Sequence, residues 1–535
     1  MRFKLVTIAI FLTTFSIMAD TLNEAVHQAL TTNPDVLFNR AKSLSTKQGV
    51  AIARGSFYPT IDVGAGAGRE TSLNPTTAAI QGGTGRRTLN RTESNFELRQ
   101  RLFAGGAVYN EMKRSHYVWQ AQEWKTLGVA ENSALDVVNR YLTVLMHEKL
   151  YSLAVQNYNR HIRVSKMINQ LTESGLSRTS DVDQSNGRIA QAEADKISAQ
   201  ANLREAKINY AKVVGKWPEK LVWPRVPPKQ HLPNSLSRAL QIGLNTHPLV
   251  KAAYMNVQEA KAQYKVSQAT RYPKVDFILS GSKNRNVDGL IGPNDDTLGM
   301  VRVSYNLFRG GSDNAHIRET AFQVQEAYEA KNGALIDLNE SIRLSWNAYQ
   351  SANLRLLPLK QHVNSSGLTR SAYQEQFKLN KRTLLDLLDS ETELYQAQNA
   401  YARGQVEEIF ARYRILNGMG KLLCYLHMDL PVNLGNNNIF MDEDDHTLLN
   451  TQDTHQTAFL NTNYKLNRVS QSYVHPEAKA ATATMSDTGE APVNTTIMTS
   501  EIAPIVSCKP NVVDDALRLL TKDAKSVQIL LDTCH

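Results

Sequence analysis

The stretch LFAGGAVYN at residues 102–110 is matched 205 positions later by LFRGGSDNA at residues 307–315. A single match of this kind could arise by chance, so its meaning depends on whether neighbouring segments repeat in the same order. Three further pairs do so: LNEAVHQALTTNP (22–34) with LSRALQIGLNTHP (236–248), FYPTIDVGAG (57–66) with RYPKVDFILS (271–280), and NYAKVVGK (209–216) with RILNGMGK (414–421). The offset changes from 214 to 205 along the chain, which indicates an internal duplication whose second copy has a loop nine residues shorter.

The sequence of each half also predicts a β-hairpin. Apolar residues alternate with other residues after the Tyr-Pro pair and again before the Leu-Phe pair, which is typical of strands with one apolar face. A polar loop separates the two segments, so we expect hairpins over about 58–104 and about 272–308. The alternating residues are Ile61, Val63, Ala65, Ala67, Phe96, Leu98 and Leu102 in the first half, and Val275, Phe277, Leu279, Val301, Val303, Tyr305 and Leu307 in the second. We expect the strand-to-helix joints at Gly105, Gly106, Gly310 and Gly311, because Gly tolerates the backbone conformations of such turns.

Beyond each joint the apolar residues step by three and four, as in Leu135, Val138 and Leu142, which predicts helix. Long helices are expected over about 106–172 and about 312–378, each roughly 100 Å long at 1.5 Å per residue. The turns TESGLSRTSD and FKLNKRTLLD then lead into returning helices. A long coiled-coil rod would explain the helical stripes, but it would not explain the alternating strands.

The boundaries of the repeats follow from composition. Residues 1–19 carry basic residues before an apolar run that ends at a small residue, which is typical of a secretory signal peptide; an N-terminal anchor helix is the alternative. The repeats are expected at 20–216 and 234–424, joined by the Pro-rich segment 217–233, which a helix or central strand would not accept. Residues 425–535 are polar and aperiodic, so a disordered tail is expected.

Composition excludes several classes of protein. The mean hydropathy is −0.38, and no internal apolar run reaches the eighteen or so residues that a spanning helix needs. The net charge is +9, but no dense basic patch is interleaved with aromatic residues, so nucleic-acid binding is not expected. No catalytic constellation, metal-ligand spacing or phosphate-binding loop is present, so we expect neither an enzyme nor a cofactor. Three cysteines do not make a disulfide framework; Cys508 and Cys534 could pair, which would leave Cys424 unpaired.

Four amphipathic strands cannot seal a pore alone. Unpaired backbone groups are very costly in hydrocarbon, so membrane strands close into barrels, of which about eight strands is the smallest. Two copies would supply eight strands around a lumen filled by side chains, and three copies would supply twelve with room for a passage. If the strands lie in a membrane, the chain must therefore form oligomers, with each repeat supplying one sector of the ring.

These features resemble the TolC family of outer-membrane export ducts from Gram-negative bacteria. The resemblance covers about residues 20–424 and rests on the duplicated Asn/His-Pro helix, the Tyr-Pro strand start, the Leu-Phe-x-Gly-Gly joint and the two helix turns. It implies a mixed α and β membrane protein, whose internally duplicated protomer gives a homotrimeric 12-stranded outer-membrane β-barrel continued by a long α-helical periplasmic barrel. It also implies contact with outer-membrane lipid, a periplasmic adaptor (membrane fusion) protein, and an inner-membrane ABC or proton-driven transporter as partners.

The resemblance assigns a gate to the second helix turn. Asp386 and Asp389 are three residues apart and share a helix face, so a trimer would place six carboxylates around one axis, raise their pKa values and attract cations. They match the closing D-x-x-D pair of the family's periplasmic entrance, whereas taken alone they would indicate only a solvated helix face. Arg382 matches the family's tethering Arg, and Ser180 and Asp181 are its expected partners in a closed-state latch.

The two turns themselves are expected to dock the adaptor, through Gly175 and Asn380. Gly is common at both places in the family, and Asn380 departs from that pattern, although Asn tolerates the left-handed conformation. Phe377 stands where a tethering Tyr is usual, so one hydroxyl tie is absent.

Several functions remain open. The leading one is a passive exit duct, in which type I protein secretion is favoured over multidrug efflux because no lipid-attachment Cys follows the apolar run and because of the form of the Leu-Phe-x-Gly-Gly phrase. A periplasmic coiled-coil scaffold is the alternative from another class, and it leaves the hairpins unexplained.

Overall fold

The computed structural model describes residues 21–80 and 85–428. The predicted signal peptide at 1–19, nearly all of the predicted tail, and both Cys508 and Cys534 therefore lie outside the described residues.

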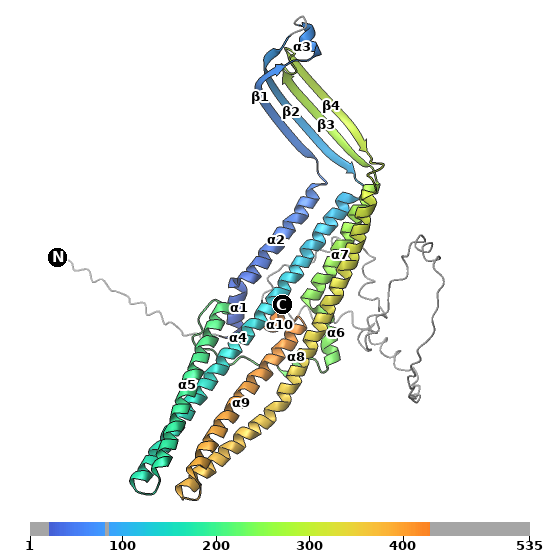
Figure 1. Ribbon diagram of the computed structural model, residues 1–535. Helices are drawn as coiled ribbons and strands as arrows, with labels where there is room; N and C mark the ends of the chain where they lie inside the picture. Colours follow the sequence, from blue (N-terminus) through green and yellow to red (C-terminus); the bar gives the residue numbers. More distant parts are fainter. Residues whose placement is uncertain (1–20, 81–84, 429–535) are drawn as a thin grey trace, which may run out of the picture. The chain divides into compact units, whose positions relative to one another are not determined.

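The described elements form two series in the same order (Figure 1). The first series is α1 (Leu22–Thr32), α2 (Pro34–Gly55), β1 (Thr60–Ser72), α3 (Pro75–Ile80), β2 (Arg87–Phe103), α4 (Ala107–Glu173) and α5 (Thr179–Val214). The second series is α6 (Leu236–Thr246), α7 (Pro248–Gln268), β3 (Lys274–Arg285), β4 (Pro293–Ser304), α8 (Ser312–Lys378) and α9 (Leu384–Gly418), followed by α10 (Leu422–Tyr425). Apart from α3, α10 and two short 3-10 helices, η1 (Lys229–His231) and η2 (Ala269–Arg271), the two series correspond element by element, so the predicted internal duplication is confirmed.

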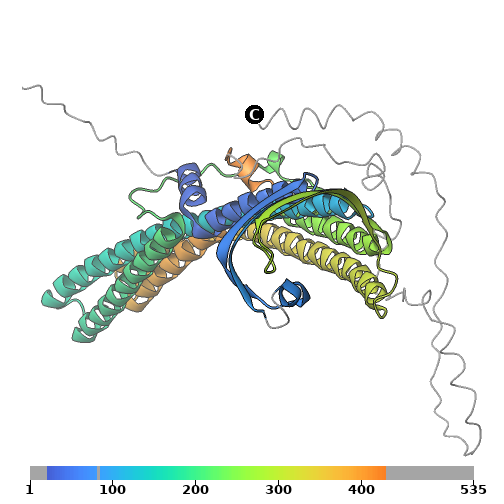
Figure 2. The ribbon, with the colours of Figure 1, turned by 90° about the horizontal axis from the view of Figure 1, so that it is seen from above.

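The four strands form one antiparallel sheet in the order β1-β2-β3-β4, and Figure 2 shows that this sheet is strongly curved. The two hairpins meet through β2 and β3, where Leu98 lies opposite Leu279 and Thr92 lies opposite Arg285. β1 and β4 each pair on one side only, so both edges of the sheet are open within the described part of the chain.

Strand β4 is shorter than the sequence predicts. It ends at Ser304, whereas the alternation predicts that Tyr305 and Leu307 continue it. The neighbouring strand begins only at Lys274, directly after Pro273, which has no N–H to donate to a ladder. Residues beyond Ser304 therefore have no partner strand in the described chain.

Helix α3 lies in a segment that the sequence predicts only as a polar loop. Asn74 caps it: the Thr77 N–H donates to Asn74 Oδ1, and the Asn74 N–H donates to Thr77 Oγ1, both at 2.9 Å. The Asn74 side chain also donates to the carbonyl of Asp288 at 2.8 Å, which ties the loop of the first hairpin to that of the second. The signal for α3 is the Asn-Pro pair before it, the same pair that begins α2.

That repeated Asn/His-Pro pair has a structural reason. Asn33 and His247 each cap a helix that has Pro at its first position, where the missing N–H costs nothing. Asn33 Oδ1 accepts from the N–H of Asp35 at 2.8 Å, and His247 Nδ1 accepts from that of Leu249 at 3.3 Å. Burial lowers the pKa of His247 to about 4, so the ring is neutral near pH 7 and can accept this hydrogen bond.

The two long helices, α4 and α8, have 67 residues each and run from the sheet to the helix turns (Figure 1). α5 returns along α4, and α9 returns along α8. Nearer the sheet, α2 and α7 both pack against α4, and α7 packs against α8 as well; nearer the turns, α9 also packs against α4. Among the described helices, none has the length and apolar character to cross a bilayer.

The Pro-rich segment between the repeats is held by two buried tyrosines, Tyr141 and Tyr413. The Tyr141 hydroxyl accepts from the N–H of Val222 at 3.0 Å and donates to its carbonyl at 2.6 Å. Tyr413 donates to the carbonyl of Arg225 at 2.9 Å. Side-chain hydrogen bonds thus satisfy part of a backbone that has no helix or sheet partners over most of its length.

Helix α10 is not predicted by the sequence. Its first N–H groups are bound by the buried Glu131: Leu422 N–H donates to Oε2 at 3.1 Å and Leu423 N–H to Oε1 at 3.3 Å. Cys424 lies in this helix, and because Cys508 and Cys534 lie outside the described residues, the possible pairing of those two cysteines stays a prediction.

Both Gly-Gly pairs lie between a strand and a long helix. Gly105, Gly106, Gly310 and Gly311 have φ values of 61, 80, 61 and 83°. Two successive left-handed residues form the reversal, a conformation that side chains with a Cβ disfavour.

Candidate gate at the tips of the helical hairpins

The helical hairpins end in two turns, one between α4 and α5 and one between α8 and α9 (Figure 1). Gly175 has φ of 72° in the first turn, and Asn380 has φ of 58° in the second. Asn380 thus adopts the left-handed conformation that Gly adopts in the first turn, as expected. Beside them, Leu176 is 73% exposed and Leu379 is 66% exposed, so each tip presents an apolar side chain to its surroundings.

An apolar cluster directly behind the tips joins the two hairpins. Its buried members are Val164, Ile168, Leu384, Leu387 and Leu388, with Met167, Val182 and Phe377 packed against them. Phe377, which stands where the resemblance leads us to expect a tethering Tyr, packs against this apolar cluster. The cluster buries one face of α9, while on the other face the side chains of Asp386 and Asp389 are 37% and 59% exposed.

Asp386 and Asp181 are equivalent residues, 205 positions apart, and both cap their own helices. The carboxylate of Asp386 accepts from the Thr383 hydroxyl at 2.8 Å and from its N–H at 3.3 Å. These hydrogen bonds hold the pKa of Asp386 below its ordinary value. Asp181 likewise accepts from the Ser177 hydroxyl at 2.7 Å and from the Arg178 N–H at 3.4 Å. The rise in pKa expected from a ring of carboxylates concerns three copies, and it stays a prediction.

Arg382 makes its contacts on its own hairpin. Nε donates to Gln376 Oε1 at 3.0 Å, Nη1 lies 3.8 Å from Asp386 Oδ2, and the guanidinium lies 4.3 Å from the centre of the Tyr373 ring. Ser180 is exposed, and neither it nor Asp181 is among these partners. The latch between Arg382 and these two residues stays a prediction for the assembled protein.

A different ion pair joins the hairpins. Arg188 Nη2, on α5, donates to Oδ1 of Asp389, on α9, at 2.8 Å, and the Arg188 side chain is 35% exposed. The two residues are 201 positions apart, and α5 and α9 make little other contact. Arg188 was not predicted from the sequence, because a lone Arg on an otherwise polar helix face carries no local signal.

A buried ion cluster lies further along α9. Glu391 is 1% exposed; Arg370 Nε, from α8, donates to its Oε1 at 2.6 Å, and Arg160 Nε, from α4, lies 3.1 Å from its Oε2. Three helices from both repeats therefore meet at one carboxylate. The sequence did contain a signal, because Glu391 follows Leu384 by seven residues and Leu388 by three, so it falls on the apolar stripe of its helix.

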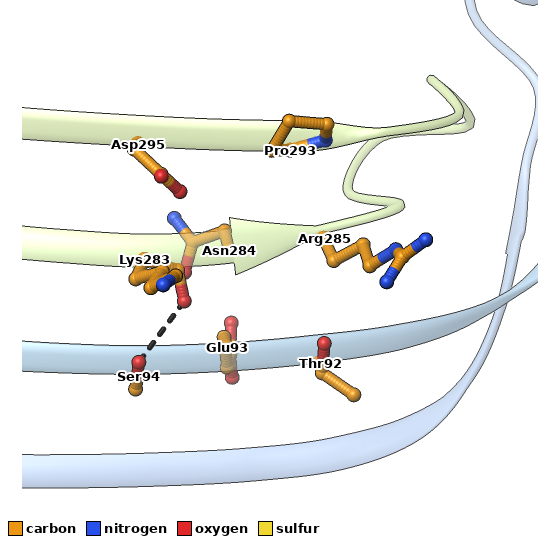
Figure 3. Close-up of a pocket in the computed structure, with 8 residues that line it drawn as sticks. All are labelled: Thr92, Glu93, Ser94, Lys283, Asn284, Arg285, Pro293 and Asp295. Carbon is orange, nitrogen blue, oxygen red and sulfur yellow. Dashed lines mark hydrogen bonds between the residues drawn. The ribbon is translucent and has the colours of Figure 1, made fainter.

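A pocket of about 580 Å³ opens near the loop ends of β2, β3 and β4 (Figure 3). It is lined by Thr92, Glu93, Ser94, Lys283, Asn284, Arg285, Pro293 and Asp295. Ser94 donates to the carbonyl of Lys283 at 3.0 Å. The lining is polar with charges of both signs, unlike the mostly apolar walls of small-molecule sites, so we assign it no role. Within the described ranges, no cluster of three or more His, Cys, Asp or Glu side chains could hold a metal ion.

Known proteins share this architecture. A family model described as outer membrane efflux protein matches residues 25–216 and 239–412, one match for each repeat. The outer membrane efflux protein BepC of Brucella suis biovar 1 (strain 1330) is 24% identical over 409 residues, which cover 76% of this chain and 86% of BepC. The outer membrane protein TolC of Escherichia coli (strain K12) is 21% identical over 433 residues, covering 76% of this chain and 83% of TolC.

The fold is also that of solved outer-membrane proteins. The structure of the outer membrane protein VceC from Vibrio cholerae has a TM-score of 0.64 to this chain at 17% sequence identity, covering 75% of this chain and 96% of VceC. The predicted fold class, the resemblance to TolC and the outer-membrane location are thereby confirmed. Because the family model spans well over half of its length, the chain belongs to the outer membrane efflux protein family, whose members are transport channels rather than enzymes.

Proposed function

We propose that the chain is the outer-membrane exit duct of a tripartite export system, in which a homotrimer passes cargo from an inner-membrane transporter and a periplasmic adaptor to the outside. The observation that carries the proposal is a four-stranded sheet with two open edges in a member of this family. Open edges are very costly in lipid, so the sheet needs further strands. Three copies supply twelve strands and leave room for a passage.

The packing of the helices supports a ring of copies. α4 packs against both α2 and α7, whereas its equivalent α8 packs against α7 and makes at most slight contact with α2 of the same chain. Large apolar side chains are exposed on α2 and α8, the two helices that lack this packing within one chain. They are Leu37, Phe38, Leu44 and Ile52 on α2, and Phe322, Ile336, Leu344, Leu354, Leu357 and Leu368 on α8. By the equivalence of the repeats, α2 of the next copy fits against α8 as α7 fits against α4.

The duplication also sets the register between copies. Leu98 lies opposite Leu279 where β2 meets β3. Val303 is equivalent to Leu98 at the offset of 205, and Ala65 is equivalent to Leu279 at the offset of 214. β4 of one copy should therefore pair with β1 of the next so that Val303 lies opposite Ala65. Val303 is 65% exposed in the single chain, as expected for a residue at an open edge.

The tips support docking of a periplasmic adaptor. Leu176 and Leu379 are exposed beside Gly175 and Asn380, at the end of the molecule farthest from the sheet (Figure 1). A partner that binds these tips would act directly on the helices that carry Asp386. An adaptor could therefore open the candidate gate, defined as Asp386 and Asp389, without contacting the membrane-embedded sheet.

For the cargo, we propose protein secretion ahead of multidrug efflux, on the form of the Leu-Phe-x-Gly-Gly joint and the absence of a lipid-attachment Cys near residue 19. Deletion of the gene tests this choice. Loss of one or more secreted proteins with unchanged drug sensitivity would support secretion, and increased drug sensitivity with an unchanged set of secreted proteins would support efflux.

Conductance measurements test the duct itself. The purified chain, reconstituted in planar lipid bilayers, is expected to form heat-modifiable trimers that conduct in discrete steps. A water-soluble monomer without conductance would contradict the proposal and would favour a periplasmic scaffold.

A further inference from the structure

We propose that Arg188 is a charge-compensating residue of the candidate gate, and that separating it from Asp389 makes the pore prefer cations more strongly. The inference rests on the proposed function, because it requires that the exposed face of α9 borders the pore. It names a specificity-determining residue for the ions and charged cargo that pass the entrance.

The geometry of the pair is the first support. The Arg188 guanidinium donates to the Asp389 carboxylate at 2.8 Å, across two helical hairpins that belong to different repeats. α5 and α9 make little other contact, so a movement that parts the two hairpins at their tips, where the apolar cluster also joins them, would separate Arg188 from Asp389. The charge on Asp389 is then no longer balanced by its neighbour.

The duplication provides the second support. If the pair were a by-product of the repeat, its equivalents would also be oppositely charged. At the offset of 205, Arg188 corresponds to Glu393 and Asp389 corresponds to Gln184. Glu393 and Gln184 cannot form an ion pair, so charge compensation occurs at the contact within one chain and not at the equivalent contact between chains.

The other gate carboxylate behaves differently. Asp386 is held by Thr383 at the start of α9, and these hydrogen bonds lie within a single helix. Movement of the hairpins would leave them intact. Opening therefore removes the neighbouring positive charge from Asp389, whereas the hydrogen bonds to Asp386 remain, and it adds up to three uncompensated negative charges to the entrance of a trimer. At physiological salt these charges act over about 8 Å, a distance comparable to the radius of a narrow pore.

The test compares two variants that each remove one member of the pair. Purified trimers are reconstituted in planar bilayers under a KCl gradient, and the permeability ratio of K⁺ to Cl⁻ is obtained from the reversal potential. Arg188→Gln should raise this ratio roughly two- to fivefold, because one uncompensated carboxylate in each copy then attracts K⁺ and repels Cl⁻ at the entrance. Asp389→Asn should lower it, and the double variant should return close to the wild-type ratio.

Two matched controls separate charge from packing. Arg188→Lys keeps the charge and should keep a ratio near that of the wild type. Arg204→Gln removes an exposed Arg from the same helix, far from the tip, and should leave the ratio unchanged. SDS-resistant trimers on gels establish that each variant has assembled.

Each outcome bears on the inference. Opposite shifts for Arg188→Gln and Asp389→Asn support it, since loss of a purely structural contact would shift both variants in the same direction. Shifts in the same direction, an unchanged ratio in Arg188→Gln, or an equal effect of Arg204→Gln would overturn it. A wild-type protein that forms no conducting trimer would instead contradict the proposed function.

Discussion

Gly105 and Tyr272 lie so close that a Cβ atom on Gly105 would be 2.8 Å from the Cβ of Tyr272 and 2.8 Å from the carbonyl oxygen of Ala269. Gly105 ends the hairpin of the first repeat, and Tyr272 precedes the hairpin of the second. The strand-to-helix joint is therefore also one of the places where the two repeats pack against each other. The duplicated sequence phrase thus reflects a packing requirement as well as a turn.

Substitution at this joint should show both effects. Gly106→Ala should lower the free energy of unfolding by about 1–2 kcal/mol, because Gly106 has a left-handed backbone. Steric overlap should add little to this loss, since the nearest atom, Asn110 Nδ2, would lie 3.4 Å from the added Cβ. Gly105→Ala should cost more, because the same backbone strain is joined by overlap with Tyr272. Guanidinium unfolding of the refolded protein in detergent measures both, and equal losses for the two variants would contradict the packing role.

Removal of the buried carboxylate in the ion cluster should be strongly destabilising. Glu391→Ala leaves Arg160 and Arg370 facing each other without a counter-charge, and loss of one partner from a buried ion pair costs about 3–5 kcal/mol. The control is Glu407→Ala, which removes the partner of Arg355 from an exposed pair and should cost about 0–1 kcal/mol. Similar losses at the two sites would mean that water reaches Glu391.

The buried Glu131 should make stability depend on pH. Burial raises its pKa from 4.5 to about 8, despite the two N–H groups that donate to it. Between these values the folded protein binds a proton that the unfolded chain releases, so stability should fall as the pH rises from about 5 to about 8. The measurement is the dissociation temperature of trimers across this range.

Glu131→Gln should flatten that pH dependence, even if the variant is less stable at every pH. Glu148→Gln removes a carboxylate that is 35% exposed and should keep the wild-type slope. An unchanged slope in Glu131→Gln would show that Glu131 is ionised in the folded protein near pH 6.

The predicted latch gives a further test of the gate. Combined Arg382→Ala and Asp181→Ala substitutions should increase single-channel conductance or antibiotic leak, since the predicted ties between them would each be weak and together would hold the closed state. Asp181 also caps α5, so Asp181→Asn, which keeps a capping side chain without the charge, separates the two roles. Unchanged conductance in folded trimers of the double variant would refute the latch.

The parts of the fold that could be predicted are those that depend on local sequence patterns. The strands follow from alternation at residues such as Ile61 and Val63, and the turns follow from Gly and from the Asn tolerance of the left-handed region at Asn380. The short helix α3 was missed, although Asn74 and Pro75 repeat the signature by which Asn33 and Pro34 begin α2. The sequence therefore does contain a local signal for α3.

The contacts between distant segments could not be predicted in the same way. Arg188 and Asp389 are far apart in the chain, and each alone is typical of a solvated helix face. Asp386 was predicted to be a gate residue, and its role as a helix cap follows from Thr383 three residues earlier. Glu391 lies between these cases, because its position on an apolar stripe shows that it is buried but does not identify Arg160 as a partner.

Cross-linking between copies tests the central claim most directly, because it asks whether the open strand edges meet in the register that the duplication implies. A chain carrying Val303→Cys and Ala65→Cys should, on mild oxidation in outer membranes, form covalent dimers and trimers on SDS gels, while either single variant should not. Val303→Cys with Ala67→Cys, the pair that a two-residue slip would bring together, should cross-link poorly. SDS-resistant trimers in which Val303 and Ala65 do not cross-link, or cross-linking at the slipped pair alone, would contradict the account.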